Sequence, residues 1–246
     1  MITNISRRLT TGALAIAGSV AAFGFAGAAP AQAQAACPLP LGQLFSSFKS
    51  TPCRVGDKLF TFINASPASG SAIDNGVLLI DQLISSTVDR HTFNYRPTPA
   101  LMQSSGTFII DYTIEIVDDP STPGENELLT KMFKEFSIGY DATGAGNFGI
   151  FTEKMVWSDS INGSALIGTS TATTALGASG AMVPVPSGIT KLFVRDTYRV
   201  DSLTGSINSI TNDFTQTTKS IDTPEPSAIL GILAVAGVGA FARRKS

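Results

Sequence analysis

The sequence has few of the residue types that most catalytic and metal sites are built from. Its 246 residues include one histidine, two cysteines and one tryptophan, and 15% of them are charged. Two cysteines and one histidine cannot close a four-ligand zinc site without carboxylates. Any Ser-His-Asp arrangement would have to use His91, and no Gly-x-Ser-x-Gly elbow accompanies it. We therefore expect no metal, no cofactor and no enzymatic activity.

An excess of positive charge is also lacking. Between residues 36 and 222 the chain carries 12 basic and 18 acidic residues, a net charge of −6. A protein that binds nucleic acid or an anionic membrane surface needs a basic face to neutralise phosphates. The balance therefore argues against both kinds of partner.

Long apolar runs are confined to the two ends, and the first predicts a secretory signal peptide over residues 1–35. Arg7 and Arg8 form the basic start, an apolar stretch follows, and Ala33-Gln34-Ala35 offers the small-x-small site for signal peptidase. The paired arginines hint at a twin-arginine signal. The position where such a signal has a bulky apolar residue holds Thr10, so we favour the general secretory route.

The other end of the chain combines a rigid tripeptide with a short apolar segment. Pro224 and Pro226 fix their own backbone and extend the residues before them, which presents Glu225 on an exposed handle. Residues 227–242 are apolar throughout, and as a helix they would measure about 24 Å. The hydrocarbon core of a bilayer is about 30 Å thick. A transmembrane helix that just reaches across, aided by its flanks, is therefore expected.

A basic stop of three residues follows this segment: Arg243, Arg244 and Lys245. Such side chains can snorkel to the headgroups and favour the cytoplasmic side. A plain membrane anchor or a buried terminal helix are the alternatives, but a core helix would need a polar face. Tripeptide, apolar helix and basic stop, in this order over residues 223–246, resemble the PEP-CTERM sorting signal of bacterial proteins that are exported and processed by an exosortase.

This resemblance covers about a tenth of the chain and implies a route rather than an activity. It implies an exosortase acting near the Pro224-Glu225-Pro226 motif, transient anchoring in the inner membrane, and delivery to the cell surface or to an extracellular matrix of exopolysaccharide. The pattern Cys, short helix, Cys and Gly56-Asp57-Lys58-x-Phe60 is similar to the N-terminus of exported proteins of this class that have no known activity.

The only two cysteines, Cys37 and Cys53, follow the expected cleavage site closely. An even cysteine count in an exported chain indicates a disulfide. Closing a loop of about 17 residues would stabilise the fold by about 3 kcal/mol in the chain-entropy model. We favour this pairing over a metal site or free thiols.

Residues 36–222 predict one all-β domain, most simply a β-sandwich. Phe108, Ile110, Tyr112, Ile114 and Ile116 alternate with polar residues, which is typical of a half-buried antiparallel strand. Residues 55–60 are expected to open the first strand, and further strands are expected at 132–140, 149–157, 164–174, 190–200 and 206–215, whereas 77–95 is ambiguous. A short helix is expected at 41–48, with Leu41, Leu44, Phe45 and Phe48 on one face. Seven to nine strands separated by turn residues suit a sandwich.

Aromatic and hydroxyl side chains are the candidates for carbohydrate contact. Most aromatic residues fall on the apolar side of alternating strands, but Trp157 stands at a strand end before Ser158-Asp159-Ser160, so we expect it to be exposed. Thr169, Thr171 and Thr173 share one strand face, where hydroxyls can bind sugar or ice. A strand face rich in β-forming residues is the simpler interpretation.

Carboxylates offer two further hypotheses. A calcium site in the acidic loop would use Asp118, Asp119, Glu125 and Glu127, although their spacing matches no EF-hand and a solvated turn is the simpler interpretation. A hydrolase would need a carboxylate acid and base, for which Asp111 with Glu115, or Asp196 with Asp201, are the candidate pairs.

Two remaining motifs are better explained by structure than by chemistry. His91 with Asp89 and Arg90 suggests a polar strand edge. Residues 144–149 match G-x-G-x-x-G, but a β-like run follows them where the dinucleotide fingerprint needs a helix. They are expected to form a glycine-tolerant hairpin loop.

The sequence thus favours an exported, exosortase-processed surface or matrix-associated protein with a non-enzymatic β-domain. A carbohydrate- or exopolysaccharide-binding module is the second hypothesis, and a secreted carboxylate-dependent hydrolase is the third.

Overall fold

The computed structural model describes residues 36–37, 42–66, 74–84, 89–102, 106–143, 149–201 and 203–218. These all belong to one compact unit of the chain, residues 34–246. The expected signal peptide and the sorting signal lie outside the described residues. Within the described ranges, no helix is long and apolar enough to cross a membrane. The transmembrane segment at 227–242 therefore stays a prediction.

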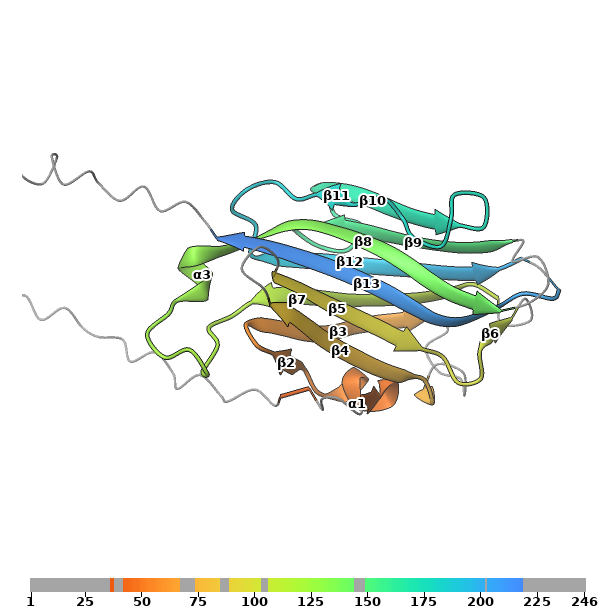
Figure 1. The fold of residues 1–246 in the computed structure, drawn as a ribbon, viewed down its shortest axis with the longest axis horizontal. Coiled ribbons are helices and arrows are strands. Elements are labelled where there is room, and N and C mark those ends of the chain that lie inside the picture. The colour runs from red at the N-terminus through yellow and green to blue at the C-terminus, as the bar shows by residue number, and fades with distance from the viewer. Residues whose placement is uncertain are drawn as a thin grey trace, which may run out of the picture. The chain divides into compact units, whose positions relative to one another are not determined.

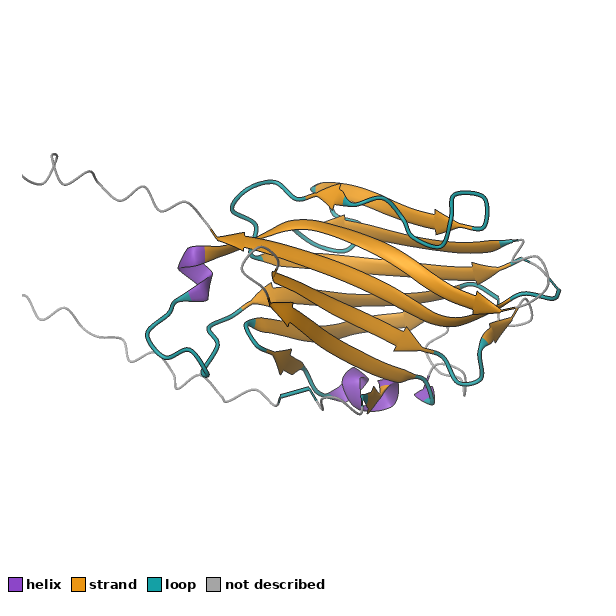
Figure 2. Ribbon diagram, viewed as in Figure 1, coloured by secondary structure: helices purple, strands orange, loops and turns teal. Residues whose placement is uncertain are grey.

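Two antiparallel sheets make up the domain (Figures 1 and 2). The strands of the seven-stranded sheet are, in spatial order, β1 (Gln43–Leu44), β4 (Val77–Ile84), β5 (Asp89–Arg96), β13 (Ser206–Thr218), β8 (Lys131–Thr143) and β11 (Val183–Pro184), with β6 (Leu101–Met102) pairing to β13. Those of the six-stranded sheet are β10 (Leu166–Thr173), β9 (Ile150–Trp157), β12 (Lys191–Val200), β7 (Phe108–Ile116), β3 (Lys58–Ser66) and β2 (Cys53–Val55). The expected all-β, sandwich-like fold is confirmed.

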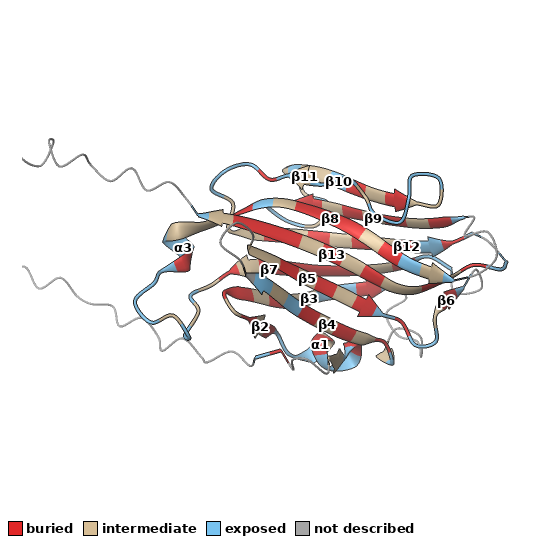
Figure 3. Cartoon of the chain, viewed as in Figure 1, coloured by how far each residue is buried: buried red, intermediate tan, exposed pale blue. Residues whose placement is uncertain are grey.

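Alternation in the sequence fixes which side of each strand faces inward. On β12, buried residues alternate with partly exposed ones from Leu192 to Val200, and β9 does the same from Ile150 to Val156 (Figure 3). Successive side chains of a strand point to opposite faces, so one face of each sheet lines the core.

Aromatic rings from both sheets fill the core. Phe93 of β5 stacks on Tyr112 of β7, with ring centroids 4.6 Å apart. Helix α1 (Phe45–Ser50) adds Phe45 and Phe48, which are fully buried against these rings and their neighbours. Offset and edge-to-face pairs of this kind add to the free energy gained by burying apolar area.

The edge of β8 is covered by the chain at 178–185. Backbone N–H groups of Gly180 and Val185 donate to carbonyls of β8, and β11 extends this pairing. Ser170 of β10 donates its hydroxyl to the Ala181 carbonyl and accepts from the N–H of Ile138. One side chain thereby ties this segment to both sheets, and the covered edge is protected from pairing with other chains.

Three details differ from the sequence-based expectations. The helix begins at Phe45 instead of residue 41, because Gln43 and Leu44 pair with β4, and Leu44 is 51% exposed. The ambiguous stretch 77–95 forms two strands, β4 and β5. The link between β8 and β9 is no hairpin, because these strands lie in different sheets. Of its glycines, Gly149 is described and has a φ of +80°, which suits a residue without Cβ.

Candidate functional site

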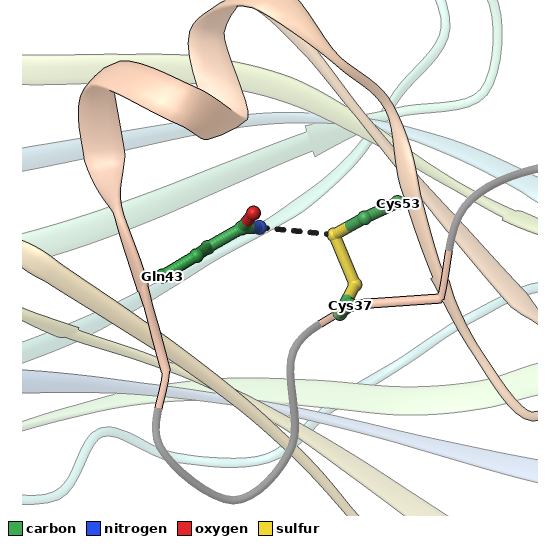
Figure 4. The surroundings of a disulfide bond; sticks show 3 residues. All are labelled: Cys37, Gln43 and Cys53. Carbon is green, nitrogen blue, oxygen red and sulfur yellow. Dashed lines mark hydrogen bonds between the residues drawn. A yellow bond between two sulfur atoms is a disulfide. The ribbon is translucent and has the colours of Figure 1, made fainter.

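The disulfide pins the start of the domain. Cys37 and Cys53 are bonded and almost fully buried, which confirms the expected pairing (Figure 4). The Gln43 side chain donates to the Cys53 sulfur at 3.1 Å, as the same figure shows. The Cys37 N–H donates to the carbonyl of Arg54, so the segment before the loop lies along β2. The cross-link fastens this segment and α1 to the edge of the six-stranded sheet.

The outward face of the six-stranded sheet carries charged, hydroxyl and aromatic side chains. Near its centre Arg195 of β12 is directly opposite Asp111 of β7, and two N–H groups donate to the two carboxylate oxygens at 2.8 Å each. A third bond of 2.8 Å joins the guanidinium to Asn162. A bidentate arginine–carboxylate pair of this geometry fixes the orientation of both side chains.

A hollow of about 350 Å³ lies at one end of this face. Its floor is a cross-strand row in which Thr173 of β10 and Arg199 of β12 flank Phe151 of β9. The Arg199 guanidinium lies 5.1 Å from the centroid of the Phe151 ring and forms an ion pair with Asp201 at 2.8 Å. An aromatic ring, a hydroxyl and an exposed ion pair on one shallow surface are groups that can contact a sugar.

Trp157 does not take part in such a surface. It is 3% exposed, so the expectation of an exposed tryptophan is wrong. It stands in a cross-strand row between Leu166 of β10 and Phe193 of β12. The turn that follows closes at once, since the Ser158 N–H donates to the carbonyl of Ala165. The position of Trp157 at a strand end predicted exposure, but the adjacent strands β10 and β12 bury its side chain.

The threonine array is present as predicted on one face of β10. Thr169, Thr171 and Thr173 are exposed or partly exposed, while Ser170 and Ala172 between them are buried. Their cross-strand partners on β9 are Met155, Glu153 and Phe151. These partners are an apolar, an acidic and an aromatic residue. The row of hydroxyls on β10 is therefore not repeated on β9.

Neither carboxylate pair forms an acid–base couple. Asp111 is bonded to Arg195, and Glu115 pairs with Lys191 at 2.8 Å. Asp196 lies in the core with 0% exposure, whereas Asp201 lines the surface hollow. All four of these carboxylates are thus paired with a basic side chain or buried, and the hydrolase built on these pairs stays a hypothesis.

The acidic loop is organised by its own hydrogen bonds. Glu127, which begins the short helix α3 (Glu127–Thr130), accepts from the N–H of Asp119 and the hydroxyl of Thr122. Asp119 in turn accepts from Ser121. Among the described residues no group of three or more histidine, cysteine or acidic side chains could hold a metal ion. The arrangement is that of a capped turn.

His91 is buried, so the expectation of a polar strand edge is wrong. It belongs to a buried polar cluster at the end of the sandwich beside α3 whose other members are Asp57, Lys58, Asp89, Lys131 and Gln216. Burial and the nearby positive charge of Lys58 lower the pKa of His91 to about 3. Burial alone would raise the pKa of Asp57, but Lys58 and its other partners lower it to about 2.

A second buried pair, Lys154 with Asp196, escaped the sequence analysis. In the sequence Asp196 is a candidate acid or base together with Asp201, and nothing in either segment pairs it with Lys154. The signal was present, because Lys154 occupies an inward position of β9 between buried Thr152 and Val156. The same holds for Lys58, two residues before buried Phe60 on β3. A lysine in phase with apolar residues predicts a buried cation.

The predicted processing motif, Pro224-Glu225-Pro226, and the basic stop, Arg243 to Lys245, lie outside the described residues.

Comparison with known proteins identifies no family for this chain. No model of a protein family matches the chain, and no curated protein sequence does. A crystal structure of the enzymatically active domain of tailspike protein 4 from bacteriophage CBA120 is similar over 61% of this chain, with 11% sequence identity and a TM-score of 0.27. This chain covers 20% of the tailspike chain, and a likeness this slight supports no inference about activity.

Proposed function

We propose that this chain is an exported protein of the bacterial surface or extracellular matrix, and that its β-sandwich has a structural rather than an enzymatic role. The observation that carries the proposal is the disulfide between Cys37 and Cys53. Structural disulfides persist in oxidising compartments outside the cytoplasm. Its first cysteine, Cys37, is the second residue after the predicted signal peptidase site. The disulfide therefore fastens the start of the mature chain to β2.

The far end of the domain supports the same route. Strand β13 ends at Thr218, a few residues before the Pro224-Glu225-Pro226 motif. An exosortase substrate requires a folded domain with a C-terminal signal. Here the domain is followed by a short polar spacer, the proline-containing tripeptide and an apolar segment. In this proposal residues 227–242 hold the chain in the inner membrane until processing near the tripeptide delivers the domain.

A structural role fits the way the domain is built. The edge of β8 is covered by the chain at 178–185, and the edge of β2 is bridged by Ala36. Covered edges prevent uncontrolled pairing between copies at high local concentration. The carboxylates Asp111 and Glu115 of β7 are paired with basic side chains of β12, so in this proposal they tie the two strands together.

Processing is tested in the producing organism with the full chain. Replacing both prolines of the motif, Pro224→Ala with Pro226→Ala, should leave the protein in the membrane fraction with its C-terminus intact. The matched control is Pro120→Ala in the exposed loop before α3, which should be processed normally. Normal release of the motif variant would contradict the proposed exosortase route.

Binding of the producer's exopolysaccharide is a second candidate function, and the hollow beside Phe151 favours it. Phe151→Ala should abolish retention on the polysaccharide, because a sugar ring loses its apolar platform. Phe193→Ala is the matched control, since Phe193 lies on the same outward face outside the hollow. Unchanged retention of Phe151→Ala, or equal loss in both variants, would contradict a binding role of the hollow.

A further inference from the structure

The core of the sandwich holds a lysine and an aspartate in direct contact. Lys154 of β9 and Asp196 of β12 are directly opposite cross-strand partners, and both side chains point inward. Nζ of the lysine lies 2.9 Å from Oδ1 of the aspartate, and both side chains have 0% exposure. Removing both ions from water is costly, and such a pair is often no better than an apolar one. Its presence at this position therefore calls for a chemical reason.

The pair is enclosed by aromatic side chains. Nζ of Lys154 lies 4.5 Å from the centroid of the Phe214 ring, which the opposite sheet contributes, and 3.1 Å from the hydroxyl of Tyr112. The hydroxyl of Tyr198 is buried nearby on the strand of Asp196. Among the described residues, the second carboxylate oxygen, Oδ2 of Asp196, has no hydrogen-bond partner. The carboxylate is thus bonded to Lys154 through Oδ1, and the hydroxyls of Tyr112 and Tyr198 also interact with it.

This enclosure favours the uncharged forms of both groups. Burial lowers the pKa of Lys154, against the attraction of Asp196. Burial likewise raises the pKa of Asp196, against the attraction of Lys154. Transfer of one proton from the ammonium to the carboxylate yields a free amine beside a carboxylic acid, the two reactants of an amide condensation.

We propose that Lys154 and Asp196 become joined by an amide bond between Nζ and the side-chain carbon Cγ, a permanent cross-link between β9 and β12. The amine lone pair adds to Cγ, a new C–N bond forms, and the C–OH bond breaks. One amine hydrogen leaves with the hydroxyl as a water molecule. The amide nitrogen keeps the other hydrogen, and no oxidation or reduction takes place.

The fold supplies what this condensation needs. The cross-strand register holds the amine against the carboxyl group, which replaces an encounter between free reactants. The tyrosine hydroxyls, Tyr112 in contact with Nζ and Tyr198 beside Asp196, are placed to position the reacting groups and to stabilise charge that develops on the carboxyl oxygen. The product keeps one carboxyl oxygen as the carbonyl of an uncharged amide, so no buried charge remains at this position.

Mass spectrometry of the purified mature protein tests the proposal without a variant. After reduction of the disulfide, the intact mass should be lower by one water molecule than the mass calculated from the determined termini. Trypsin should fail to cut after Lys154 and should release residues 135–191 carrying residues 196–199 as a branch. A full calculated mass, with cleavage after Lys154 and a free peptide 196–199, would overturn the proposal.

Two variants assign the partners. Asp196→Ala should restore the full mass and the cleavage after Lys154, whereas Lys134→Ala, at an exposed lysine of β8, should keep the deficit. Buried Asn212 offers a rival carboxamide in the core. Loss of one ammonia molecule with a branch at Asn212 would overturn the assignment to Asp196. The measurement on the unaltered chain decides the matter even if Asp196→Ala does not fold.

Discussion

Acid should destabilise this protein through the protonation of one buried imidazole. His91 is the only histidine of the chain and is 0% exposed. Its ring nitrogens lie 3.6 Å from Asp57 and 3.7 Å from Asp89. Burial and the charge of Lys58 nevertheless lower the pKa of His91 from 6.5 to about 3. The folded protein therefore holds a neutral imidazole at a pH where the unfolded chain has a charged one.

The size of the effect follows from the two pKa values. Between pH 6.5 and 3 the unfolded state binds one more proton than the folded state, so the free energy of unfolding falls as the pH falls. Relative to neutral pH, the loss is about 2 kcal/mol at pH 5 and about 3 kcal/mol at pH 4. Asp57, whose pKa is lowered to about 2, adds a further loss only below pH 4.

Urea unfolding of the full chain at half-unit pH steps from 7.5 to 4 measures this slope. The same series on His91→Gln should show no loss between pH 7 and 5, whatever its absolute stability, because the titrating group is gone. A free energy of unfolding in the unaltered protein that stays constant from pH 7 to 5 would refute the reasoning. An equal slope in both proteins would refute it as well.

Two further variants test the core and the disulfide. Replacing Cys37 and Cys53 together by alanine should lower the free energy of unfolding by about 3 kcal/mol, because the closed loop no longer restricts the unfolded chain. Denaturant unfolding measures this difference, and a change under about 1 kcal/mol would count against the entropic explanation. Trp157→Ala should lower it by about 3–5 kcal/mol by leaving a cavity, and an unchanged melting temperature would show that the side chain is exposed after all.

The strands were predictable because one face of each sheet is buried. Alternation from Phe108 to Ile116 identified β7, and the expected strands at 149–157 and 190–200 match β9 and β12 within a residue or two. The inward faces of these strands follow from this period of two. The pairing of strands does not, because it depends on which edges meet in three dimensions. The two-residue strands β1, β6 and β11 are too short to leave a pattern.

The polar features of the core were harder to predict, for a physical reason. Sequence rules assign lysine, aspartate and histidine to the surface, since a buried charge is costly unless it is paired. Lys154 and Asp196 come from different strands, so their pairing depends on register and is not visible in either segment. Trp157 shows the opposite error, because its polar sequence neighbours predict exposure. In the fold its cross-strand neighbours Leu166 and Phe193 lie beside it and the side chain is buried.

The central claim, that this is an exported cargo processed at its C-terminus, is tested most directly by the mass of its mature C-terminal peptide. The account predicts that the surface or extracellular form ends near the Pro224-Glu225-Pro226 motif and lacks residues 227–246. Recovery of a surface form that still carries Arg243, Arg244 and Lys245 would contradict it.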